Sequence, residues 1–213
     1  MVFIDEIQYL KNPSNFLKLL YDEYHENMKL VVSGSSSFYI DQKFKDSLMG
    51  RKELYEIFSM NFEEFLDFQE EIIIKEFLFD KKKIPLGYKN RIDELFLEYL
   101  TYGGYPEVVL LSDREKKQRK LEQLSLDYIK KDIYDANLQE ADKFFALLKI
   151  LATQIGSLVN VSDLSNALQI SQQTVEKYLY VMRKSYSISL VKPFWTNVKA
   201  ELVKMPKAYF LDH

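Results

Sequence analysis

The sequence predicts a helix-rich fold of the α/β plus α class: a partial parallel sheet, a helical region, and a C-terminal pair of helices followed by two strands. Two short apolar runs, residues 2–4 and 30–32, enclose a helical pattern, which is the order of a β-α-β unit with parallel strands. The chain has 6 Gly and 5 Pro in 213 residues, so turns are few and helices should dominate. Near residue 170 a tight turn separates two helical patterns, which is typical of a helix-turn-helix.

The first 60 residues contain the elements of the predicted sheet. Val2 to Ile4 is expected to be a buried strand, and the turn at Asn12-Pro13-Ser14 is expected to start a helix. That helix has apolar side chains at helical spacing, namely Phe16, Leu17, Leu19, Leu20 and Tyr24. Leu30 to Val32 is a second strand, residues 38–49 suit a short helix, and the polar–apolar alternation of residues 53–58 predicts a third strand.

From Asn61 the pattern becomes helical, and residues 81–87 form a charged, broken linker. A helix with apolar positions between Ile92 and Leu100 ends at Gly103-Gly104, and a long charged helix runs from Asp113 to about Asn137. The basic cluster at residues 116–120 is flanked by acidic side chains, so we expect a solvated helix face with i,i+4 ion pairs.

The last part contains three further helices and two strands. An apolar helix from Phe144 to Ile155 is stopped by Gly156, Ser162 is expected to cap a short helix, and Ser171 to cap a longer one. Strands at residues 188–191 and 208–211 would complete a winged helix. The predicted domains are therefore 1–60 for the sheet, 61–142 for the helical region and 143–213 for the winged helix.

Composition excludes several classes of protein. Hydrophobic residues make up 47% and charged residues 29%, which is ordinary globular usage. The chain has no Cys, which removes disulfides, thiol catalysis and zinc–thiolate sites and fits a reducing cytoplasm. With two His, a histidine metal site and a Ser-His-Asp triad are disfavoured. No apolar run reaches the roughly 20 residues of a membrane span, and acidic residues by position 5 argue against a signal peptide. We therefore expect a cytoplasmic protein with no membrane partner.

The opening string, Val2-Phe3-Ile4-Asp5-Glu6, has the pattern of a Walker B strand. In ATPases with that strand the Asp helps to hold Mg²⁺ and the Glu helps to orient the attacking water. An acidic pair also ends many strands by chance, so the motif needs its structural context. Residues 33–37 are expected at the carboxyl end of the next strand, where a hydroxyl can sense a γ-phosphate.

Arg51 has two interpretations. Its guanidinium could neutralise charge on a transferring phosphoryl group, as some ATPases achieve with an arginine from a neighbouring subunit. It could equally be a surface arginine at the end of a helix. Spacing alone leaves both open.

The helix after Ser171 suggests nucleic acid. Residues 143–213 carry nine Lys and Arg against four Asp and Glu, whereas residues 1–142 carry 20 against 28. Gln and Thr can read base edges and Lys and Arg can hold phosphates. The candidate side chains that lie off the apolar face are Gln172, Gln173, Thr174, Lys177, Tyr180 and Arg183. The alternative is a protein-interaction module.

Several strings, taken together and in order, resemble the bacterial and archaeal P-loop ATPases of the AAA+ superfamily that carry a helical, winged-helix-like region after the ATPase core. The resemblance runs over nearly the whole chain, and its strings are 3–8, 33–36, 47–51, 61–65, 102–107, 128–133 and 206–212. It implies that Asp5 is the Mg²⁺ residue, Glu6 the water-orienting residue, Ser35 a sensor and Arg51 a phosphate-contacting arginine. It also implies a P-loop NTPase core with ATP and Mg²⁺ as cofactors of the intact parent.

The chain departs from this family in two places. It has no Gly-x-x-x-x-Gly-Lys-Ser/Thr loop, and the family's further α/β domain after residues 209–212 is missing. We therefore expect a fragment, or a degraded gene, that is inactive alone and binds no cofactor. The alternative is a non-catalytic winged-helix module that binds DNA or protein.

The resemblance also predicts self-association. It places the missing phosphate-loop strand between residues 30–33 and 54–58, so the strand at 30–33 is expected to have an unpaired edge. A second copy could supply a strand there. Alternatively, residues 54–58 could close inward and leave a monomer.

Overall fold

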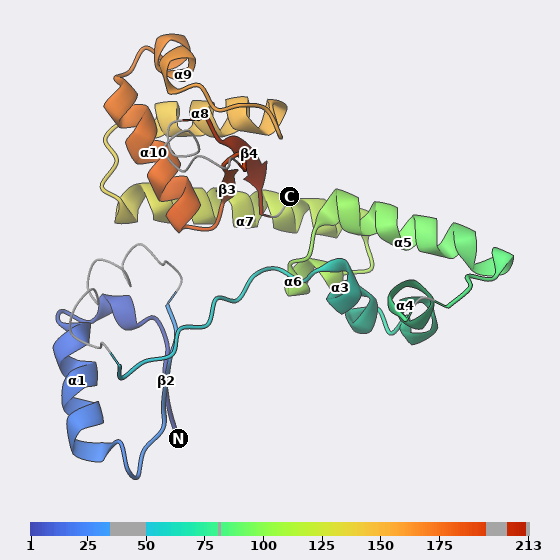
Figure 1. Ribbon diagram of the computed structural model, residues 1–213, viewed down its shortest axis with the longest axis horizontal. Coiled ribbons are helices and arrows are strands. Elements are labelled where there is room, and N and C mark those ends of the chain that lie inside the picture. Colours follow the sequence, from blue (N-terminus) through green and yellow to red (C-terminus); the bar gives the residue numbers. More distant parts are fainter. Residues whose placement is uncertain (35–49, 81, 195–203, 212–213) are drawn as a thin grey trace.

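A computed structural model describes residues 1–34, 50–80, 82–194 and 204–211 (Figure 1). The N-terminal unit has strand β1 (Val2–Ile4), the 3-10 turn η1 (Ile7–Tyr9), helix α1 (Pro13–Tyr24) and strand β2 (Leu30–Val32). β1 and β2 are parallel, with Phe3 opposite Val31. Ile7 and Leu17 form a small buried cluster beneath the strands. The predicted β-α-β unit is therefore present.

Two predictions for this unit have different outcomes. Residues 52–58 are extended but form no strand, which corrects the strand expected at 53–58. A strand is defined by backbone hydrogen bonds to a neighbour, and between the described residues no such bond joins residues 53–58 to another segment. The expected helix at 38–49 lies in a range that the structure does not describe.

The middle of the chain is helical, as predicted. Its elements are α3 (Phe62–Phe68), α4 (Ile72–Phe79), the turn η2 (Leu86–Tyr88), α5 (Lys89–Tyr102) and α6 (Pro106–Val109). Asn61 starts α3 with a capping box: its side chain accepts from the Glu64 amide, and the Glu64 carboxylate accepts from the Asn61 amide, both at 2.9 Å. Phe65, Leu66, Ile74, Leu95 and Val109 form the buried core of this region.

Gly104 holds the end of α5 against the start of α3. Gly103 ends α5 with a φ of 73°, in the left-handed region that glycine adopts readily. The next residue then lies against Met60, whose amide donates to the Gly104 carbonyl at 2.8 Å. A Cβ on Gly104 would lie 2.0 Å from the Met60 carbonyl oxygen, so this contact requires glycine.

Helix α7 (Arg114–Asp135) connects the middle region to the C-terminal region (Figure 1). The structure corrects the solvated face expected at residues 116–120. Arg119 does pair with Glu115 at i,i+4, but Lys117 is 3% exposed and its ammonium lies 2.5 Å from the Glu98 carboxylate of α5. The burial of Lys117 results from the packing of α5 on α7, which a local charge pattern does not reveal.

The C-terminal region contains α8 (Ala141–Thr153), α9 (Val161–Leu168), α10 (Gln172–Lys184) and the antiparallel strands β3 (Ile188–Val191) and β4 (Lys207–Phe210). Its buried core includes Phe144, Leu147, Val175 and Met182. Ser171 caps α10 as predicted, by accepting from the Thr174 amide at 3.0 Å. Asn160, and not Ser162, caps α9: its side chain accepts from the Ser162 and Asp163 amides.

None of the helices in the described ranges combines the length and the apolar character that crossing a bilayer requires.

We predict that Gly104→Ala lowers the free energy of unfolding by about 1–3 kcal/mol, because the added Cβ overlaps the Met60 carbonyl and forces the backbone to move. The matched control is Gly87→Ala, where a Cβ meets nothing within 4 Å, and we expect a change within about 0.5 kcal/mol. Urea denaturation followed by circular dichroism measures both. Equal stability of the two variants would contradict the close approach.

Candidate functional site

Polar groups gather where β1 and β2 end. Asp5 follows β1 and Ser33 follows β2, and the Ser33 hydroxyl donates a hydrogen bond to the Asp5 carboxylate. Backbone bonds fix the same corner: the Ser33 amide donates to the Ile4 carbonyl at 2.9 Å, and the Ile7 amide donates to the Ser33 carbonyl at 3.1 Å. The carboxyl ends of parallel strands are where α/β folds place ligand-binding groups, so the two strands present Asp5 and Ser33 together.

Glu6 occupies a turn with unusual backbone geometry. Its φ of 51° and ψ of 48° lie in the left-handed region, which is uncommon for a residue with a Cβ. The Glu6 amide donates to the Asp5 carboxylate at 3.0 Å, which holds the turn. The Glu6 carboxylate lies 3.4 Å from the ammonium of Lys131 on α7. The site therefore combines two carboxylates, a hydroxyl and a lysine from a distant helix.

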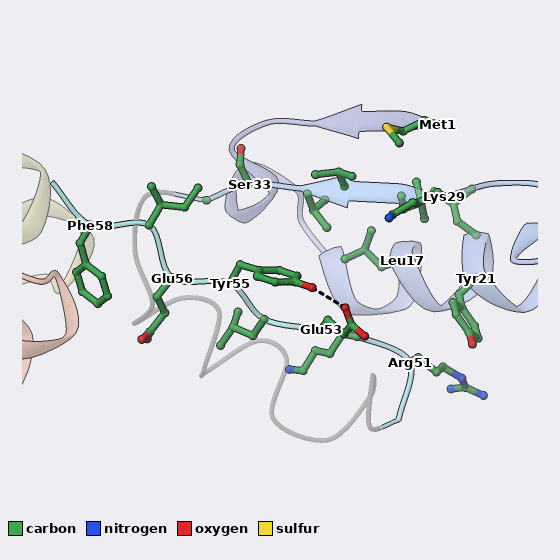
Figure 2. Close-up of a pocket in the computed structure, with 18 of the residues that line it drawn as sticks. Met1, Leu17, Tyr21, Lys29, Ser33, Arg51, Glu53, Tyr55, Glu56 and Phe58 are labelled. Atoms are coloured by element: carbon green, nitrogen blue, oxygen red, sulfur yellow. Dashed lines mark hydrogen bonds between the residues drawn. The ribbon is translucent and has the colours of Figure 1, made fainter. Parts of the chain in front are cut away.

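The other two residues that the resemblance implied are not at this corner. Ser35 lies outside the described residues. Arg51 pairs with Asp22 of α1 at 3.2 Å, and its guanidinium lies 5.8 Å from the centre of the Tyr21 ring. Figure 2 shows Arg51 and Tyr21 at the opposite end of β2 from Ser33. Within one copy of the chain, Arg51 and the carboxyl ends of the strands are apart.

A cavity of about 1570 Å³ lies beside β2. Its lining includes β2, the end of α1 and residues 50–59, and in Figure 2 β1 and the 51–58 segment lie on opposite sides of β2. Tyr55, in this segment, donates to the Glu53 carboxylate at 2.7 Å, and that hydrogen bond raises the pKa of the Tyr55 phenol.

The edge of β2 that faces this cavity follows from the register. The Lys29 carbonyl and the Ser33 amide both bond to β1, so the amides and carbonyls of residues 29, 31 and 33 face β1. The amides and carbonyls of Leu30 and Val32 therefore face the other way. Val32 is 38% exposed, and Ile57 across the cavity is 94% exposed. Within the part of the chain that the structure describes, this edge of β2 pairs with no other strand and faces the cavity.

Helix α10 presents a polar face in the C-terminal region. Gln172, Gln173, Lys177 and Arg183 are exposed. The Arg183 guanidinium lies 5.6 Å from the centre of the Tyr180 ring. Thr174, by contrast, is half-buried, and its hydroxyl is hydrogen-bonded to Ser171 at 2.8 Å in the helix cap. Tyr180 is exposed as well, so five of the six predicted nucleic-acid residues share an accessible surface.

Comparison with known families divides the chain into two regions. Residues 1–66 match the family described as an AAA domain, so the region that contains Asp5 and Glu6 is an AAA-like, ATPase-type domain. Residues 93–213, more than half of the chain, match the family described as a domain of unknown function (DUF8612). The protein belongs to that family.

Relatives cover the full extent of this chain but are longer than it. Two uncharacterized proteins of Methanocaldococcus jannaschii are 26% and 27% identical to it, each over 99% of this chain and 46% of the relative. An uncharacterized protein of Haemophilus influenzae is 26% identical over 99% of this chain and 50% of the relative. The chain thus spans about half the length of these relatives. No solved structure matches it significantly.

Sequence reasoning missed Lys131 at the candidate site. Its neighbours in sequence, Lys130 and the surrounding charged helix, gave no reason to separate it from a solvated face. A contact between residues 125 positions apart has no local signal.

We propose that the outer edge of β2, which pairs with no strand among the described residues, recruits residues 53–58 of a second copy. Light scattering at low concentration should then give a mass of about twice 25.3 kDa. Val32→Lys should shift the protein toward monomer, because lysine on a strand edge opposes pairing.

The matched control is Leu19→Lys, which adds the same charge to an apolar side chain that is 55% exposed on α1 and does not line the cavity. It should leave the mass unchanged. A wild-type mass near 25.3 kDa, with slow amide exchange at residues 30–33, would show instead that residues 54–58 close inward.

Proposed function

We propose that residues 1–66 provide the acidic half of an ATP-hydrolysing site in a longer protein. The observation that carries this proposal is the corner at the carboxyl ends of β1 and β2, where Asp5 accepts a hydrogen bond from Ser33 and Glu6 follows directly. The match to the AAA domain family supports the same chemistry. The corner then corresponds to a Walker B strand beside a sensor strand.

Each residue has a proposed role in that site. ATP would supply the transferring phosphoryl group. Mg²⁺ would supply the positive charge that draws the nucleotide to the acidic corner. Asp5 would hold Mg²⁺. One carboxylate suffices for that role, since Mg²⁺ is commonly bound by one or two carboxylates together with substrate phosphates. Glu6 would orient the attacking water, and Ser35 would act as the sensor. Arg51 would contact phosphate in a neighbouring subunit, since within one copy it pairs with Asp22.

The phosphate-binding half is not in these 213 residues. The chain has no Gly-x-x-x-x-Gly-Lys-Ser/Thr loop, so it lacks the array of backbone amides and the lysine that hold the β- and γ-phosphates. The deciding observation is the reading frame upstream of Met1. A phosphate loop there supports the ATPase, and a frame without one favours a non-catalytic module.

For the 213-residue chain itself, we predict no useful affinity for ATP. Asp5 and Glu6 alone place negative charge where the nucleotide phosphates would bind. Calorimetry with MgATP should show no saturable heat. A micromolar dissociation constant would contradict this prediction.

A second candidate function rests on α10. We propose that the C-terminal region is a winged helix that binds DNA through the exposed face of α10, with protein binding as the alternative. The specific observation is that Gln172, Gln173, Lys177 and Arg183 are all exposed on this helix. Its exposed face also contains Glu176, so the contacts should be weak and directed mainly to phosphates.

We predict that Lys177→Ala with Arg183→Ala weakens binding to duplex DNA at low salt, and that wild-type affinity falls steeply as salt rises. Fluorescence anisotropy measures both effects. Lys149→Ala is the control, because it removes one exposed positive charge from α8 and leaves α10 intact. If the chain does not bind duplex DNA at low salt, the hypothesis that this region binds protein is favoured.

A further inference from the structure

The contact between Glu6 and Lys131 joins the two regions that match separate families. Glu6 lies in the AAA-like region, 1–66, and Lys131 lies in the family region 93–213. Their charged groups are 3.4 Å apart, with 38% of the Glu6 side chain and 28% of the Lys131 side chain exposed. Solvent reaches both groups, so the pair orients a carboxylate and contributes little to stability.

Hydrogen bonds restrain the backbone at Glu6. The left-handed turn at Glu6 is held by its own amide, which donates to Asp5, and by the Ile7 amide, which donates to Ser33. The main chain is thus restrained on both sides of the residue. The contact with Lys131 bears on the direction of the carboxylate.

Lys131 is on a helix that cannot rotate freely. Ile129 is buried in the C-terminal core, and Ile133, one turn later, packs against the same core. Residue 131 lies about 200° around the helix from residue 129, so its side chain leaves the opposite face of α7. The C-terminal core therefore determines which way Lys131 points, and it points to Glu6.

We propose that Lys131 is the positioning residue of the water-orienting Glu6, so that the ATPase site is complete only when residues of the family region 93–213 contribute to it. One carboxylate oxygen of Glu6 accepts from Lys131, and this contact would help to orient the carboxylate toward the attacking water. The pattern is the general one in which a base is oriented by a third group. This inference rests on the proposed ATPase function.

The contact is tested first in the 213-residue chain, which has no native Cys. A Glu6→Cys, Lys131→Cys variant should be cross-linked within one chain by a short bismaleimide. The control pair is Glu6→Cys with Lys120→Cys, about three turns away on the same helix, where Lys120 instead pairs with Glu107. Equal cross-linking of both pairs, or none of the first, overturns the proposal.

The role is tested in a form of the protein that carries a phosphate-binding loop. Lys131→Ala should lower kcat for ATP about three- to ten-fold with KM unchanged, and Lys131→Arg should restore most of it, because arginine also donates to a carboxylate. Glu6→Gln should lower kcat about 100-fold or more. In that background Lys131→Ala should have no further effect.

The outcomes separate the two proposals. Hydrolysis that is unaffected by Lys131→Ala, raised by it, or lowered equally in the Glu6→Gln background overturns the positioning role and leaves the ATPase standing. A loop-carrying form that forms the cross-link and hydrolyses no ATP overturns the proposed ATPase, and the role of Lys131 with it.

Discussion

The packing of α7 is the constraint on which the rest of the molecule depends, because its two ends are buried in different places. Near its start, Lys117 is enclosed against α5, where it pairs with Glu98 at 2.5 Å. Near its end, Ile129 is 9% exposed in the C-terminal core. A helix of 22 residues spans about 33 Å, so α7 sets the separation between the middle and C-terminal regions. It also carries Lys131 to the N-terminal unit.

The N-terminal unit is expected to have little folding stability by itself. In the part of the unit that the structure describes, the two strands have three residues each, and the buried apolar residues are Ile7 and Leu17, with Ile4 and Leu30 packed against them. A two-stranded sheet of this size is marginal in water and needs packing against other elements. Contacts such as the hydrogen bond from Tyr186 to Glu56, at 2.7 Å, and the edge-to-face contact of Tyr186 with Phe58 join the chain after this unit to the C-terminal region. The acidic corner is therefore built on a unit that depends on its neighbours.

The two regions that match separate families hold different parts of the candidate sites. The AAA-like region contains Asp5, Glu6 and the strand ends of the acidic corner. The family region 93–213 contains α7, a large apolar core and the exposed face of α10. The core of the second region includes Phe144, Val175 and Met182, each at 1% exposure or less. Because Ile129 of α7 is part of this core, the packing of the core fixes the helix face from which Lys131 reaches Glu6. This arrangement gives a physical reason for the two regions to occur in one chain.

The sequence by itself determined the local features. Short-range rules of spacing and capping account for the helix start at Pro13, the cap at Ser171, the end of α5 at Gly103 and the strands at residues 2–4, 30–32 and 188–191. They place the end of α8 too late, because it ends at Thr153 and not at Gly156. It also determined that Asp5 and Ser33 lie together, because the carboxyl ends of parallel strands share one edge.

Only the tertiary structure decided the rest. The burial of Lys117, the pairing of Arg51 with Asp22 and the contact of Lys131 with Glu6 depend on how helices pack. Residues 53–58 have the alternating pattern of a strand but are not assigned as one, because a strand also needs a hydrogen-bonded neighbour and the described residues provide none for this segment. The local sequence favours a helix, strand or turn in each segment, and long-range packing determines which other segments it contacts.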